Sequence, residues 1–86
     1  MASVAEVKAA IDAAMVHVQE GQLAVRSANE QLGEAQLNLA TAVDGSAHEA
    51  VQTAQAALAQ AATELQECLT ATLLAIDQAE TYVATL

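Results

Sequence analysis

Two histidines and one cysteine are the side chains of this sequence that could bind a metal ion or act as strong nucleophiles. The spacing of His17, His48 and Cys68 matches no zinc-binding motif. In a chain that folds back near its middle, these three positions fall at different heights and do not converge. We therefore expect no metal site. His48 is predicted to be the second residue of a helix near the hairpin tip, and Cys68 a small buried apolar residue.

Carboxylates are the other groups that could do chemistry in this chain. The nearest pairs at a helical-neighbour spacing are Glu30 with Glu34 and Glu64 with Glu67. General acid–base catalysis also needs a partner base and a pocket that excludes water. A rod of two helices offers no such pocket. We predict that the protein is not an enzyme and that it uses no cofactor.

Charge and composition narrow the range of partners. Eleven acidic residues against Lys8 and Arg26 give a formal net charge of −9, which repels the phosphates of nucleic acids. No apolar run approaches the roughly 18 residues that a membrane span needs, and the N-terminus lacks the basic start and apolar core of a signal peptide. We expect no nucleic-acid binding and no membrane span. The expected location is the cytoplasm, or the outside of the cell after export without a cleaved signal peptide.

One segment near the middle of the chain carries the signals of a chain reversal. Gly45 can adopt the left-handed conformation that ends a helix. Ser46 is typical of an N-cap, and Glu49 three residues later completes a capping box. Ser3 and Glu6 form the same pattern at the start of the chain. The prediction is a single domain, 1–86, with a helix at about 4–43, a turn at 44–46 and a helix at about 47–85.

Both arms repeat apolar residues every seven positions, which predicts an all-α, antiparallel two-helix hairpin of coiled-coil type. On the first arm the large residues are Val4, Ile11, Val18, Val25, Leu32 and Leu39, with companions three residues further on: Val7, Ala14, Gly21, Ala28, Ala35 and Ala42. On the second arm they are Val51, Leu58 and Leu65, with companions Ala54 and Ala61, and then Leu69, Ile76 and Val83. The step of four from Leu65 to Leu69 is interpreted as a phase slip. Folding about Gly45 pairs residues whose numbers add up to about 90.

Further apolar residues lie outside the predicted seam. Val16, Leu23 and Leu37 share one heptad position, which Glu30 interrupts, about 170° from the predicted seam centre. Leu74 lies level with Val16. These residues are either scattered exposed side chains, which are normal on any surface, or a second packing face. Under the second interpretation the chain forms a homodimer or a larger assembly, in which two hairpins pair into a four-helix bundle.

The hairpin as a whole resembles a family of small actinobacterial Ala/Gln-rich helical proteins of unknown function, through its Gly45-Ser46 turn, its Ala/Gln-rich arms and Tyr82 near the C-terminus. It is more loosely similar to the type VII secretion (Trp-X-Gly, ESAT-like) hairpins. Both motifs of that second family are absent, because the turn contains no tryptophan and Leu86 stands where an acid would follow Tyr82 by four residues. The looser resemblance implies a dimeric, leaderless hairpin.

Three functions are compatible with such a rod. The leading hypothesis is a non-catalytic protein–protein interaction module that self-associates and presents an acidic exterior to a protein partner. The first alternative is an acidic mimic that inhibits a nucleic-acid-binding protein. The second is an amphipathic coat that opens its seam onto a surface. A salt-sensitive complex with a basic DNA-binding protein would favour mimicry, and adsorption to neutral lipid droplets would favour the coat.

Overall fold

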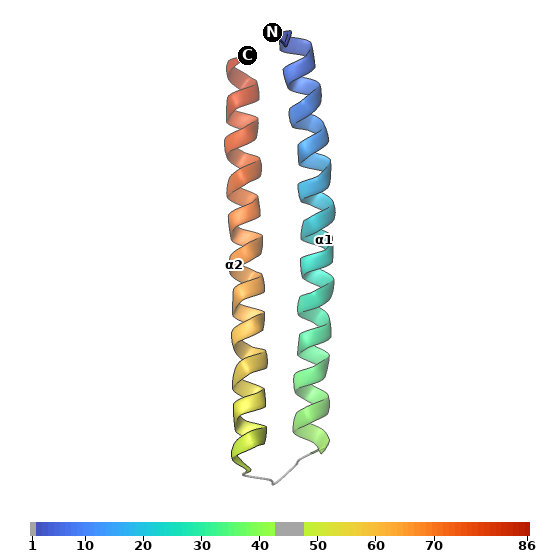
Figure 1. Cartoon of the computed structure of the whole chain (residues 1–86), viewed down its shortest axis with the longest axis vertical. Coiled ribbons are helices and arrows are strands. Elements are labelled where there is room, and N and C mark those ends of the chain that lie inside the picture. Colours follow the sequence, from blue (N-terminus) through green and yellow to red (C-terminus); the bar gives the residue numbers. More distant parts are fainter. Residues whose placement is uncertain (1, 43–47) are drawn as a thin grey trace.

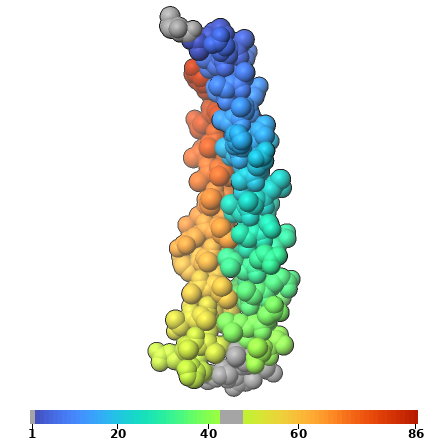
Figure 2. All heavy atoms as spheres, turned by 45° about the vertical axis from the view of Figure 1, so that its right-hand side comes forward, coloured from blue at the N-terminus to red at the C-terminus, as the bar shows by residue number. Residues whose placement is uncertain are grey.

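A computed structural model describes residues 2–42 and 48–86. It contains two long helices, α1 (Val4–Ala42) and α2 (Glu49–Thr85), and no strand within the described part of the chain. The helices run antiparallel and side by side, so that the two termini lie at the same end (Figure 1). The molecule measures 63 × 18 × 15 Å, and a view turned by 45° shows the same narrow rod (Figure 2). The predicted all-α hairpin is therefore confirmed.

The start of α1 follows the prediction. Ser3 is the N-cap: its side-chain Oγ accepts a hydrogen bond from the backbone N–H of Glu6 at 3.1 Å. Its carbonyl oxygen accepts the first bond of the helix, from the N–H of Val7 at 3.0 Å. The side-chain bond satisfies one of the N–H groups that a helix start leaves without a partner. The predicted first residue, Val4, is confirmed.

The start of α2 differs from the prediction. The N-cap is His48 rather than Ser46, and α2 begins at Glu49. His48 has extended backbone angles (φ −62°, ψ 133°), and its Nδ1 accepts a hydrogen bond from the N–H of Ala50 at 3.1 Å. An imidazole nitrogen can replace the usual hydroxyl oxygen because the cap needs only an acceptor beside the first N–H groups. Gly45 and Ser46 lie outside the described residues. Glu49 is the first residue of the helix rather than the third, and His48 precedes the helix.

The seam of α1 combines the predicted large residues, except Val4, which is 52% exposed, with different companions. Its half-buried or buried residues from the second turn onward include Ile11, Met15, Val18, Gln22, Val25, Asn29, Leu32, Gln36 and Leu39. The companions thus lie four residues after each large residue, and three of them carry amides. The predicted companions Ala14, Gly21, Ala28, Ala35 and Ala42 are exposed, and Val7 alone is half-buried. The residues three and four positions after a large apolar residue lie on opposite sides of it around the helix. The side with the residues four positions on faces α2.

The seam of α2 is continuous, so the predicted phase slip is wrong. Its partly or fully buried residues include Val51, Gln55, Leu58, Ala62, Leu65, Leu69, Thr72, Ile76, Ala79 and Val83. The steps between them alternate between four and three, which is an unbroken heptad pattern. The step from Leu65 to Leu69 is one of these regular steps. Of the predicted companions on this helix, Ala54 is exposed and Ala61 is half-buried beside Ala62.

Two polar contacts cross the seam and set the register. The side-chain Nε2 of Gln22 donates to Thr72 Oγ1 at 3.0 Å, and that of Gln55 donates to the carbonyl oxygen of Gln36 at 3.1 Å. The residue numbers of these pairs add up to 94 and 91, so the register lies one to four residues beyond the predicted sum. We call the set of inward residues of both helices the main seam.

Candidate functional site

The side chains that could bind a metal ion or act as nucleophiles are dispersed on the surface of the rod. Cys68 is exposed, so the prediction of a small buried residue is wrong. It lies one residue before the seam residue Leu69, about 100° away around α2. The Nδ1 of the exposed His17 lies 3.8 Å from the carboxylate of Glu20, one turn further along α1. Among the described residues, no three His, Cys, Asp or Glu side chains gather closely enough to hold a metal ion.

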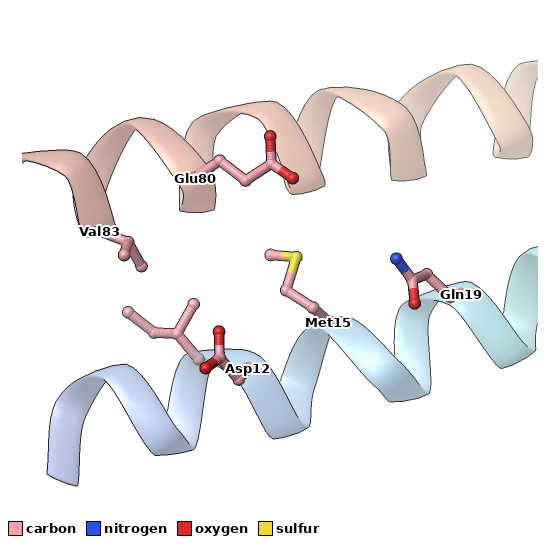
Figure 3. Close-up of a pocket in the computed structure, with 6 residues that line it drawn as sticks. Asp12, Met15, Gln19, Glu80 and Val83 are labelled. Atoms are coloured by element: carbon pink, nitrogen blue, oxygen red, sulfur yellow. The ribbon is translucent and has the colours of Figure 1, made fainter. Parts of the chain in front are cut away.

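An open groove of about 230 Å³ lies between the helices near their free ends. Its lining consists of Ile11, Asp12, Met15, Gln19, Glu80 and Val83. Met15 points from α1 toward α2, and Val83 points back toward α1 (Figure 3). Two carboxylates therefore flank an apolar floor. Such a groove suits an apolar side chain better than an anion.

The sequence analysis missed this groove because it left Met15 out of the seam. Met15 stands four residues after Ile11, which is the companion position that the structure uses. A flexible thioether is a common filler of irregular gaps between helices. The methionine four residues after Ile11 was therefore the sequence signal that could have predicted the groove.

The four predicted interface residues are all exposed outside the main seam. Val16, Leu23 and Leu37, here named the outer stripe, are 51%, 65% and 64% exposed, and Leu74 is 60% exposed. With the companions corrected, the outer stripe lies about 120° from the centre of the main seam on α1, closer than the predicted 170°. Leu74 lies on the far side of α2. Its neighbour Leu73, which is 54% exposed, lies on the same side of the hairpin as the outer stripe.

Burial of polar and apolar residues on α1 is inverted at two places. Gln22 is 5% exposed, yet Leu23 beside it is 65% exposed. Fourteen residues further on, Gln36 is half-buried and Leu37 is 64% exposed. A helix with a single partner would be expected to turn the leucines inward and the amides outward. α1 therefore has two distinct surfaces: α2 covers the one with the amides, and the one with the leucines is exposed.

The molecule is thus an antiparallel helical hairpin of coiled-coil type with an uncovered apolar flank on α1. No protein-family model, no curated protein and no solved structure matches the chain. Within the described residues, neither helix is apolar over a stretch long enough to cross a lipid bilayer.

Proposed function

We propose that the protein is a non-catalytic interaction module that works by self-association, two hairpins forming a four-helix bundle. The observation that carries this proposal is the inverted burial on α1, where amides occupy the main seam and leucines face outward. A second hairpin covers those leucines. The acidic exterior that remains is available to a protein partner.

The exposed area of the single hairpin supports this proposal. The chain exposes 6068 Å², whereas a compact protein of the same mass exposes about 4,800 Å². The excess, about 1,300 Å², exceeds the roughly 800 Å² that each partner buries in a typical stable complex. Within the described part of the chain, the residues classed as buried are Leu69 and Gln22. One hairpin therefore has little interior, and pairing supplies more.

The energetics point the same way. Burying a side chain as exposed as Leu23 or Leu37 contributes about 1–2 kcal/mol. Two copies supply four such leucines and two residues Val16. Their sum offsets the lower estimates of the cost of association. The further roughly 8 kcal/mol that a micromolar dimer requires has to come from the rest of the area that the two hairpins bury.

The experiment introduces charge into the outer stripe. The double variant Leu23→Glu, Leu37→Glu should shift the mass measured by light scattering from twice the 8.8 kDa of the single chain to that of the single chain, because two carboxylates would have to be buried in each copy. Helicity measured by circular dichroism should stay largely unchanged, since both positions are exposed in the single hairpin.

The matched control is Ala24→Glu, Asn38→Glu, which adds charge at the same spacing on an exposed face of α1 away from both surfaces. This control should keep the mass of the wild type. A wild-type chain that is already a monomer at about 100 µM would contradict the proposal, and so would a double variant with unchanged mass.

A further inference from the structure

The outer stripe belongs to a second heptad seam on α1. Its members alternate at steps of three and four, as in the main seam: Val16, Gln19, Leu23, Arg26, Glu30, Gly33, Leu37 and Ala40. All of them are exposed except the half-buried Gly33. The two seams lie about 100° apart around the helix. This angle is close to the right angle between the two neighbours of each helix in a square four-helix bundle.

Gly33 has no explanation within the single hairpin. A Cβ built at Gly33 would meet no atom within 4 Å, so no neighbour in the chain requires a glycine. A glycine inside a helix costs up to about 1 kcal/mol relative to alanine. On the second seam, the missing side chain leaves a notch, flanked by Glu30 and Leu37, that a large side chain from another helix can occupy.

The charged side chains of the second seam, Arg26 and Glu30, make no ion pair with each other or with α2 in the described part of the single hairpin. Arg26 and Glu30 are exposed, and the ion pair between His17 and Glu20 involves neither of them. In a chain of formal charge −9 with two basic residues, an arginine beside an apolar stripe is a distinctive feature. A partner surface needs an acid opposite Arg26 and a base opposite Glu30.

We propose that a second copy of this chain docks on the second seam, with the two α1 helices antiparallel and the numbers of facing residues adding up to 56. This inference rests on the self-association proposed above and specifies its geometry. The two-fold axis passes at the height of Ala28. Leu23 then lies over the notch at Gly33 of the second copy. Arg26 lies opposite Glu30 of the second copy, and each contact occurs twice.

The neighbouring registers are less complementary. A shift by one heptad in one direction places Leu23 opposite Arg26 of the second copy. A shift in the other direction places Glu30 over the notch and Leu37 opposite Arg26. The register of 56 pairs the opposite charges, sets Leu23 against Gly33 and sets Val16 against Ala40. Charge complementarity across an interface fixes the register in this way.

The same register also accounts for the groove of Figure 3. Residues 37–42 of the second copy lie at the height of residues 14–19, where Met15 and Gln19 line the inner half of the groove. The groove opens on the side of the hairpin that carries the second seam, so the second copy covers this half. The exposed Leu73 of α2 lies on that side too and joins the bundle. Leu74 stays outside it.

The decisive experiment mixes two charge-reversal variants. Arg26→Glu places two acids opposite each other, and Glu30→Arg places two arginines opposite each other. Each variant alone should therefore raise the dimer dissociation constant about tenfold or more. An equimolar mixture should recover a dimer close to wild-type affinity, because every pair in the mixed dimer joins opposite charges. Sedimentation equilibrium measures all three samples.

The control is Glu34→Arg, which makes the same charge change at an exposed position outside the second seam. It should leave the dimer at least as stable as the wild type, since it lowers the net negative charge. Single variants that dimerise like the wild type, or a mixture that fails to recover, would overturn the register while leaving self-association intact. A monomeric wild type would instead remove both proposals.

A second pair of variants tests the notch. Gly33→Leu fills it and should raise the dissociation constant about tenfold or more, although leucine is the better helix former. Gly21→Leu is the matched control, since Gly21 also has open space around it but lies on the opposite flank of α1. This control should leave the dissociation constant unchanged. Equal dissociation constants for the two variants would overturn the placement of Leu23 over Gly33.

Discussion

The two seams of α1 differ in composition and in what covers them. The main seam places Gln22 and Gln36 against α2, where an amide–hydroxyl bond and an amide–carbonyl bond cross the pair. The second seam carries Leu23 and Leu37 and remains open. Buried hydrogen bonds add little net free energy but penalise other registers strongly. The intramolecular contact therefore favours a defined register, whereas much of the apolar surface of α1 stays exposed.

The largest expected effect is on the main seam. Leu69→Ala should lower the free energy of unfolding by about 2–4 kcal/mol, because Leu69 is 7% exposed and its removal leaves a cavity. The matched control, Leu74→Ala, removes the same atoms from a residue that is 60% exposed and should change stability by less than about 0.5 kcal/mol. Urea denaturation at one protein concentration measures both. Equal losses would mean that the main seam is not where stability resides.

An intermediate effect tests why an amide occupies the main seam. Gln22→Leu should raise the free energy of unfolding by about 1 kcal/mol, because a buried polar group is replaced by an apolar one. The hydroxyl of Thr72 keeps its bond to the carbonyl oxygen of Leu69 at 2.7 Å, so no buried donor is orphaned. A loss of stability in urea denaturation would show that the amide contributes free energy as well as register.

The smallest effect on the free energy of unfolding is expected at Leu23, the residue after Gln22. Leu23→Gln gives residue 23 the side chain of residue 22, and it should change the free energy of unfolding of the single hairpin by less than about 0.5 kcal/mol. The same change should weaken self-association, as measured by sedimentation equilibrium. Unfolding is therefore measured at a concentration below the dissociation constant. A large loss there would place Leu23 in the intramolecular contact and abolish the distinction between the two seams.

The sequence predicts the hairpin because its strongest signals are local. Ser3 with Glu6 marks a helix start wherever the rest of the chain lies, and heptads on both arms require a helical partner. The start of α2 is less predictable. Ser46 is a common N-cap, and His48 is an uncommon one, so propensity favoured the wrong residue by two positions.

The composition of the main seam was harder to predict. Large apolar residues mark one position of each heptad, and the companion lies three or four residues further on. By hydropathy alone, the alanines and glycine three residues after a large residue suit an interior better than Gln22 or Gln36, which lie four residues after one. The structure shows the opposite: the side-chain amide of Gln22 donates to Thr72, and the backbone carbonyl oxygen of Gln36 accepts from the side-chain amide of Gln55. Single-residue propensities do not report such partners. The prediction of a second packing face depends on Leu23 and Leu37, which are exposed outside the main seam, and it stays a prediction.

The dimensions of the rod govern how the protein moves through solution. A particle 63 Å long and 15 to 18 Å wide experiences more friction than a sphere of equal mass, so it leaves a gel-filtration column earlier than its mass implies. A single chain can thus imitate a dimer on a column calibrated with globular proteins. Tumbling is also anisotropic, being slow end over end and fast about the long axis. The N–H vectors of both helices point along that axis, so their nuclear relaxation resembles that of a much larger protein.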